Sequence, residues 1–343
     1  MKDFYTMGIE TSCDDSSVAI LKNDREVLIN LISSQIDIHK IFGGVVPEIA
    51  SRKHLEAINP LIEKALLDTN LSYSDIDLIS VTKGPGLIGS LLVGISAAKA
   101  LSLSANIPMI GTNHMQGHIC ANYLSNKDLE PPFISLVVSG GHTYLVKVND
   151  YTDYEIIGTT RDDAAGESYD KIARSIGLGY PGGPKIDKLS KEGNKDAIDF
   201  PRIMLEKDSY DFSFSGLKTS VLNYMNHQNQ KNLEINKADL AASFQEAVVD
   251  VLVEKSMRLI DETGLNTFAV SGGVAANSRL KERLKEECEK RGVKFYYPDI
   301  IFCTDNAAMI AMAGYLNYKA GARSDNYLKV YPNLGLSFDI IDL

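Results

Sequence analysis

Two stretches of the sequence, about 130 residues apart, share a pattern of an apolar strand, a turn of small polar residues and a second apolar strand. The first copy runs from Met7 through the turn 11–16 to Leu21. The second runs from Phe133 through the turn 139–142 to Val148. An internal repeat of this kind indicates a duplicated architecture, so we expect two α/β halves with a ligand cleft between them.

The segments around the two copies alternate between helical and strand patterns. Residues 45–67 and 238–263 place apolar side chains every three or four positions, which predicts amphipathic helices. Residues 78–81 and 267–270 are short apolar runs that predict buried strands. The basic stretch Arg52-Lys53-His54 on the first helix is expected to be exposed, and no role is assigned to it.

The stretch Asn113-His114-Met115-Gln116-Gly117-His118 lies where an apolar strand gives way to a helix. Two imidazoles four residues apart lie on one helical face and can close on a single metal ion. In HExxH proteases a glutamate follows the first histidine, but here Met115 does, so a peptidase would lack its general base. Two capping or core histidines are the alternative interpretation. The pair needs a third ligand; Thr304 is expected to cap the helix 307–316, and Asp305 to project from its first turn.

Glycine-rich turns occur at several strand ends. Ser-Gly-Gly occurs at 139–141 and again at 271–273, where the following helix N-terminus suits an anion or a ribose. A further cluster at 179–183 would permit close approach of the backbone to a ligand, although an ordinary flexible loop explains it too.

Residues 84–89 form a literal GxGxxG sequence between a strand and a helix. A dinucleotide site requires an acidic residue about 20 positions later, and none occurs between Asp77 and Asp128. We therefore expect a tight turn that lets a small-residue helix pack closely.

The composition narrows the class of protein. At 343 residues, with 44% hydrophobic and 23% charged residues, the chain should form two domains and is neither disordered nor fibrous. Its net charge of -10 argues against strong binding of a polyanion by the chain alone. Four scattered cysteines without a CxxC argue against a disulfide framework. No apolar signal region or membrane-length run occurs, so a cytoplasmic protein without membrane association is expected.

Several of these motifs, in this order, resemble the TsaD/Gcp/OSGEP family of tRNA threonylcarbamoyltransferases, once named O-sialoglycoprotein endopeptidases. The resemblance covers essentially the whole chain. It rests on Gly8 to Asp14, Asn113 to His118, Val137 to His142, Asp163 to Lys171, Gly179 to Pro184, Ser271 to Asn277 and Thr304-Asp305-Asn306.

The resemblance implies an actin-like α/β fold of the sugar-kinase and Hsp70 type (ASKHA), with one lobe at 1–112 plus 322–343 and the other at 113–321. It implies that one Fe²⁺ per subunit, with Zn²⁺ as the alternative, is held by His114, His118 and Asp305. It implies an adenylate site at Val137, Val138, Ser139, Gly140, Gly141, Asp170, Gly183, Asp187 and Asn277.

The implied reaction moves the threonylcarbamoyl group of threonylcarbamoyl-AMP to N6 of adenosine 37 in tRNAs that read ANN codons, forming t6A. An exocyclic amine is a weak nucleophile, so catalysis must activate the carbonyl and stabilise the departing AMP. Asp14 is the candidate carboxylate near the reacting group, with a structural turn acid as the alternative. The resemblance implies TsaB, as a heterodimer partner bound through a helix of the first lobe, and TsaE.

Three other functions compete with this one. A small-molecule kinase of the same fold would need magnesium and a carboxylate base but no histidine pair. A metalloprotease is disfavoured by Met115, and a noncatalytic scaffold would tolerate substitutions at the ligand sites.

Overall fold

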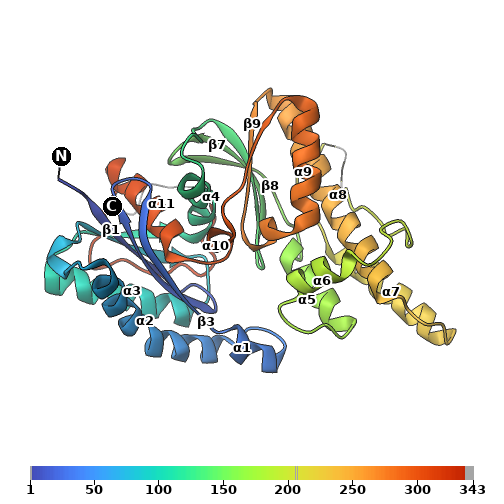
Figure 1. Cartoon of the computed structure of the whole chain (residues 1–343), viewed down its shortest axis with the longest axis horizontal. Helices are drawn as coiled ribbons and strands as arrows, with labels where there is room; N and C mark the ends of the chain where they lie inside the picture. The colour runs from blue at the N-terminus through green and yellow to red at the C-terminus, as the bar shows by residue number, and fades with distance from the viewer. Residues whose placement is uncertain (1, 205, 207, 337–343) are drawn as a thin grey trace. The chain divides into compact units, whose positions relative to one another are not determined.

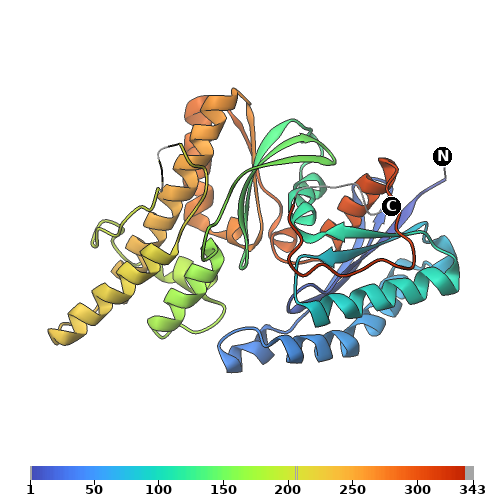
Figure 2. The same ribbon diagram turned by 180° about the vertical axis from the view of Figure 1, so that it is seen from behind.

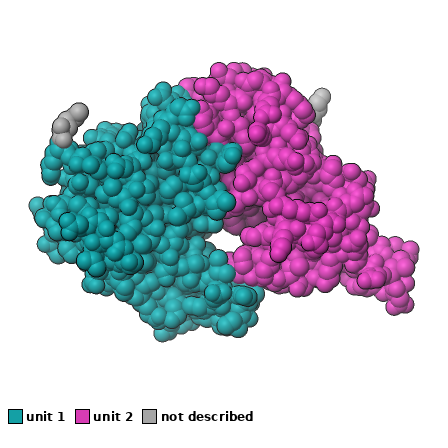
Figure 3. Space-filling view, viewed as in Figure 1, with its two compact units in different colours: residues 1–131, 149–154, 297–343 teal, residues 132–148, 155–296 magenta. Residues whose placement is uncertain are grey.

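The computed structural model describes residues 2–204, 206 and 208–336. The chain divides into two compact units, which Figure 3 colours separately. Unit 1 takes in residues 1–131, 149–154 and 297–343, and unit 2 takes in residues 132–148 and 155–296. The lobe boundaries expected from the sequence, after residues 112 and 321, stay a prediction.

Unit 1 is built on a five-stranded sheet in the order β3-β2-β1-β4-β5. Strand β1 (Tyr5–Glu10) pairs antiparallel with β2 (Asp15–Lys22), which pairs antiparallel with β3 (Glu26–Ser34). On its other side β1 runs parallel to β4 (Leu78–Gly84), and β4 runs parallel to β5 (Met109–Asn113). The carboxyl ends of these three parallel strands therefore share one edge, where α/β proteins bind ligands.

Helices cover both faces of this sheet (Figure 1). Met7 and Ile9 of β1 share an apolar core with α2 and α3, while a Cβ at Gly8 would clash with the Ala307 carbonyl oxygen. Successive strand residues point to opposite faces, so Gly8 lets α11 lie close to the face away from α2 and α3. The helices of unit 1 are α1 (Ile36–His39), η1 (Lys40–Phe42), α2 (Pro47–Thr69), η2 (Tyr73–Asp75), α3 (Ile88–Ala105), α4 (His114–Ser125), α10 (Ile300–Cys303) and α11 (Ala307–Lys319).

Unit 2 repeats the same strand order. Its sheet runs β10-β9-β6-β7-β8, with β6 (Phe133–Val138) antiparallel to β7 (Thr143–Asp150) and parallel to β9 (Thr267–Ser271). The outer strands are β8 (Asp153–Thr159) and β10 (Lys294–Tyr296), the latter parallel to β9. Both the duplication and the α/β class predicted from the sequence are therefore confirmed.

One apolar core joins the unit 2 sheet to its helices. Figure 2 shows the sheet and the helices from behind. Phe244, Val248 and Leu252 of the long helix α8 pack in this core with Ile134 and Leu136 of β6. The helices of unit 2 are α5 (Ala165–Ser175), α6 (Gly182–Ser190), α7 (Ser215–Gln230), α8 (Lys237–Thr263), η3 (Gly273–Ala276) and α9 (Ser278–Arg291).

Among the described residues, one helix, α3, has the length and hydropathy that would let it cross a membrane. It packs against α2 and β4, and its buried residues belong to the core of unit 1. Packing inside the unit accounts for one side of this helix, while Ile88, Leu92 and Leu103 remain exposed.

Candidate functional site

The two histidines of the HxxxH stretch begin helix α4 at the edge where β5 ends. Asn113 Oδ1 accepts hydrogen bonds from the amides of Met115 at 2.8 Å and Gln116 at 3.3 Å, which caps the helix. His114 is therefore the first residue of α4, and His118 follows one turn later. The strand-to-helix junction predicted from the sequence is confirmed.

Asp305 reaches the histidines from the chain just before the N-cap of α11, not from the first turn of that helix as predicted. The side chain of Asn306, not Thr304 as predicted, caps this helix by accepting from the Met309 amide at 3.0 Å. The prediction was wrong because the residue next to the helix has extended backbone and fills the cap position itself. Gln116 of α4 and Asn317 of α11 exchange two amide hydrogen bonds of 2.8 Å, which fixes the two helices relative to each other.

The structure brings His114, His118 and Asp305 together. The Nε2 atoms of both histidines lie 3.3 Å from Asp305 Oδ1, and the three ligand atoms lie within 4.8 Å of one another. Two ligands bound about 2.1 Å from a tetrahedral metal are about 3.4 Å apart, so the spacing suits a transition metal. This group can hold a metal ion.

The hydrogen bonding of the two imidazoles also suits metal ligation. His114 Nδ1 lies 2.9 Å from Glu10 Oε2 and 3.2 Å from Ser12 Oγ, an arrangement that orients Nε2 toward Asp305. His118 is fully buried; its Nε2 lies within ion-pair distance of Asp305, but among the described residues neither ring nitrogen makes a hydrogen bond. Unpaired buried nitrogens are costly, and a cation would satisfy one of them.

Glu10 was missed by the sequence analysis. Its carboxylate is fully buried and also accepts from Thr82 Oγ1 at 2.6 Å and from the Ser12 amide. A carboxylate that holds the second nitrogen of a ligating histidine is a common supporting contact in metal sites. Its position at the carboxyl end of β1, on the same edge as Asn113, was the signal that could have found it.

The site is rich in negative charge. Burial alone would raise the pKa of Asp305, but the two histidines hold it well below its ordinary value. Burial alone would lower the pKa of His114, but Asp305 and Glu10 raise it well above its ordinary value. Burial raises the pKa of Asp15 to about 7, and the carboxylates of Asp305, Asp14 and Glu10 act in the same direction. Several carboxylates therefore compete for little positive charge, which a divalent cation would supply.

The turn that carries Asp14 is closed by the start of α3. The Leu87 amide donates to the Ser12 carbonyl oxygen at 2.7 Å, and a Cβ on Gly86 would lie 2.5 Å from that oxygen. The GxGxxG sequence is thus a close-packing turn, as predicted.

The second turn, 139–142, is open at Gly140 and Gly141, while Gly166 packs against it at Ser139, whose carbonyl oxygen accepts from the Gly166 amide at 3.3 Å. Within it the Ser139 amide donates to the His142 carbonyl oxygen at 2.9 Å, and the His142 amide donates to Ser139 Oγ at 3.2 Å. Gly140 and Gly141 are exposed, and a Cβ on either would meet nothing within 4 Å. Val137 and Val138 are fully buried residues at the end of β6.

The other predicted adenylate residues lie in the same unit, around α6 and the start of α9. Asp170 accepts from the Gly182 amide at 2.6 Å, and a Cβ on Gly183 would meet nothing within 4 Å. Asp187 accepts from Ser278 Oγ at 2.9 Å. Asn277 caps α9 through the Leu280 amide at 2.9 Å and donates to Gln245 Oε1 at 2.7 Å, so each end of its amide keeps one hydrogen-bonding position.

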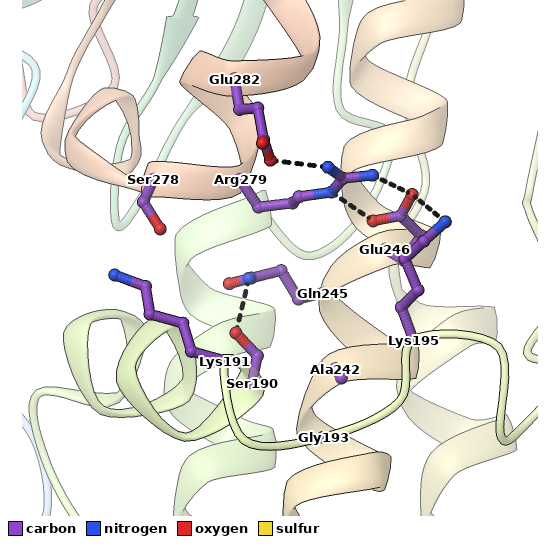
Figure 4. A pocket seen from close by; sticks show the side chains of 10 residues that line it. All are labelled: Ser190, Lys191, Gly193, Lys195, Ala242, Gln245, Glu246, Ser278, Arg279 and Glu282. Carbon is purple, nitrogen blue, oxygen red and sulfur yellow. Dashed lines mark hydrogen bonds and ion pairs between the residues drawn. The ribbon is translucent and has the colours of Figure 1, made fainter.

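A cavity of about 500 Å³ is lined by Gln245 and Ser278, the hydrogen-bond partners of Asn277 and Asp187 (Figure 4). Gln245 donates to Ser190 Oγ at 2.8 Å on one side of it. Arg279 is held by Glu246 through bonds of 2.7 and 2.8 Å. Burial alone would raise the pKa of Glu246, but Arg279, Lys195 and Arg283 lower it to about 2. The charged side chains that line the cavity are already paired.

Comparison with known proteins identifies the family. The family described as "TsaD: tRNA N6-adenosine threonylcarbamoyltransferase" matches residues 26–312. A tRNA N6-adenosine threonylcarbamoyltransferase of Clostridioides difficile (strain 630) is 57% identical over 98% of this chain and 100% of its own length. One of Clostridium botulinum (strain Hall) is 55% identical over 96% of this chain and 97% of its own.

Among solved structures, the activator of the 2-hydroxyisocaproyl-CoA dehydratase from Clostridium difficile, with bound ADPNP, aligns with a TM-score of 0.53 and 16% identity over 92% of this chain and 96% of that one. The HypF of T. kodakarensis aligns with a TM-score of 0.64 and 15% identity over 93% of this chain, which covers 48% of that one. At these identities the likeness concerns the fold, and it confirms the predicted ASKHA class.

Proposed function

The chain belongs to the TsaD family of tRNA N6-adenosine threonylcarbamoyltransferases, and from this membership we propose how its residues carry out the transfer. The protein is a transferase that forms t6A on tRNA. The observation that carries this assignment is the match to a named relative over 98% of the chain. It favours the transferase over the peptidase, kinase and scaffold alternatives.

The proposed donor is threonylcarbamoyl-AMP, and the acceptor is N6 of adenosine 37. A bond forms between N6 and the carbamoyl carbon, the bond from that carbon to the phosphate oxygen breaks, and AMP leaves. One proton must leave N6. Asp14 is the proposed carboxylate near the reacting group and the candidate acceptor for this proton.

His114, His118 and Asp305 are proposed to hold one Fe²⁺, with Zn²⁺ as the alternative. The ring nitrogens of His118, which make no hydrogen bond among the described residues, and the 3.3 Å spacings support this assignment. A bound ion of this kind would supply Lewis-acid polarisation of the carbamoyl carbonyl oxygen. Glu10 holds His114 in the orientation that ligation requires.

The adenylate is proposed to bind in unit 2. The phosphate would be received by the amides of Gly140 and Gly141, because open glycines let an anion approach the backbone. These two glycines follow the buried residues Val137, Val138 and Ser139. Asp170, Gly183, Asp187 and Asn277 would receive the ribose and base, and the adjoining cavity gives the base room.

The chain is proposed to act in the cytoplasm with TsaB and TsaE. Its charge of -10 gives it a poor electrostatic footprint for a tRNA backbone, so a partner must supply contacts. TsaB is proposed to form a heterodimer through α2 and α3, which together expose Leu55, Leu67, Ile88, Leu92 and Leu103.

To test the function, purified chain is given threonylcarbamoyl-AMP and unmodified tRNA, alone and with TsaB and TsaE, and t6A is measured by mass spectrometry of the digested tRNA. We expect multiple turnovers only with both partners. Multiple turnovers by the chain alone would refute the dependence on partners. No t6A in any combination would refute the function.

A further inference from the structure

His54 lies on the buried side of α2, so its expected exposure was wrong. Its Nδ1 lies 2.7 Å from Ser16 Oγ, and its Nε2 lies 2.9 Å from the Cys13 carbonyl oxygen. A carbonyl oxygen only accepts, so Nε2 carries the ring proton. Burial lowers the pKa of His54, so the ring is neutral at neutral pH and its Nδ1 accepts from the Ser16 hydroxyl.

These two bonds bracket the acidic pair of the first turn. Cys13 and Ser16 are the residues on either side of Asp14 and Asp15. One rigid imidazole therefore spans the segment that carries both carboxylates, with a donor on one ring nitrogen and an acceptor on the other.

A second connection runs from α2 to the same segment. The Gln35 amide donates to the Asp14 carbonyl oxygen at 3.0 Å, and Gln35 Nε2 donates to the Ala50 carbonyl oxygen at 3.4 Å. Ala50 lies one helical turn before His54 on the buried side of α2. The helix α2 thus holds the backbone of this segment directly at Cys13 and through Gln35 at Asp14, beside the pairing of Asp15 with Ser34 of β3.

We propose that His54 is a positioning residue for threonylcarbamoyl transfer, which fixes the turn that presents Asp14 and Asp15. This inference rests on the function proposed above. It also makes α2 a physical link between the turn and the exposed side chains of Leu55 and Leu67, which belong to the proposed partner surface. A displacement of about 1 Å at a reacting group can cost 100-fold in rate, so a residue outside the chemistry can control it.

A purely structural role for His54 is the competing explanation, and matched variants separate the two. His54→Phe keeps an aromatic ring of similar shape and removes both hydrogen bonds. His54→Gln keeps one donor and one acceptor on a carboxamide. Ser16→Ala removes one of the two bonds and leaves the helix intact. Ile62→Val is the control, because Ile62 lies two turns later in the apolar core of the same helix.

Each variant is compared with the wild type in three measurements: hydrogen exchange of the peptide spanning residues 11–18, metal content, and the single-turnover rate with its half-saturating concentration of threonylcarbamoyl-AMP. In His54→Phe we expect exchange of the turn to speed up at least about 10-fold and the rate to fall about 10- to 100-fold. Metal content and the half-saturating concentration of threonylcarbamoyl-AMP should stay within about twofold of the wild type, as expected for a change that leaves binding intact. Ser16→Ala should show a smaller effect in the same direction, and His54→Gln should recover most of the rate.

Unchanged exchange of the turn in His54→Phe and Ser16→Ala would overturn the inference. The inference would also be overturned if the loss of rate were in the same proportion to the fall in thermal midpoint in His54→Phe and in Ile62→Val. If the wild type makes no t6A, the proposed function fails, while the exchange measurement still decides whether His54 fixes the turn.

Discussion

The two hairpins share a strand order but differ in what surrounds their turns. Main-chain and side-chain atoms of α2 and α3 close on the first turn, at Ser12 and Cys13. In the second turn, Gly140 and Gly141 face open space. One backbone path was thus kept in both copies while the packing around it diverged. A closed turn holds side chains in fixed positions, and an open glycine turn offers its amides to a ligand.

The two units also differ in how their buried carboxylates are compensated. In unit 1, crowding and burial raise the pKa of Asp15 to about 7. In unit 2, Glu246 lies among Arg279, Arg283 and Lys195, and its pKa falls to about 2. The surroundings of Asp15 therefore lack the positive charge that the surroundings of Glu246 contain, which is the electrostatic argument for a cation at the first place and not at the second.

The largest expected effect follows from removing Asp305. Asp305→Ala should lower metal affinity by more than about 100-fold, because a direct ligand contributes more than the residues that orient it. Metal content after dialysis, measured by elemental mass spectrometry, checks this prediction. His227→Ala, at an exposed histidine of α7, is the control and should keep its metal. Equal metal in Asp305→Ala and the wild type would contradict the site.

Glu10→Gln should have the next largest effect on metal affinity. The amide keeps the shape of the side chain but loses the charge that holds His114 Nδ1, so metal affinity should fall about 10- to 100-fold. Competition with a chelator of known affinity measures the change. An unaltered affinity would mean that the neutral amide orients His114 equally well.

Gly140→Val tests the open turn. It should weaken AMP binding by at least about 10-fold while the thermal midpoint stays unchanged, because the side chain occupies free space that the phosphate needs. Calorimetry measures the affinity, and Gly216→Ala at the start of α7 is the control.

Gly86→Ala tests the first turn, 11–16. Its Cβ meets the Ser12 carbonyl oxygen, so the thermal midpoint should fall. If Gly140→Val and Gly86→Ala changed AMP affinity and thermal midpoint in the same way, the two turns would not differ as proposed.

The smallest effect concerns Glu246. Its folded pKa is depressed from 4.5 to about 2, so its contribution to stability is present above pH 4.5 and is lost as pH falls toward 2. Between pH 7 and pH 4 the stability advantage of the wild type over Glu246→Gln should shrink by roughly 0.5–1 kcal/mol. Thermal midpoints at the two pH values measure this. An advantage that grows on acidification would have the wrong sign.

Local patterns predicted much of this structure. The alternation of apolar residues around Met7 and Phe133 was enough for the duplicated hairpins, and the spacing of His114 and His118 was enough for their shared helical face. The resemblance supplied Asp305 as the third ligand, and the fold brings it to the histidines.

What the sequence did not reveal depends on contacts between distant segments. Glu10 contacts His114 from 104 positions away, and His54 contacts Ser16 from 38 positions away. Neither partner leaves a local signature, because burial depends on which helix covers which face of the sheet. His54 in particular follows two basic residues, which suggested a solvated stretch, while its helical position turns it inward.

The central claim is that the first turn, 11–16, belongs to the metal site and that the second turn, 139–142, belongs to the nucleotide site. The most direct measurement is the affinity of Asp305→Ala for AMP by calorimetry, beside its metal content. We expect the variant to lose its metal and to bind AMP within about twofold of the wild type, since the proposed AMP contacts all belong to unit 2. Loss of AMP affinity by more than about 10-fold, with the fold intact, would contradict this division of roles.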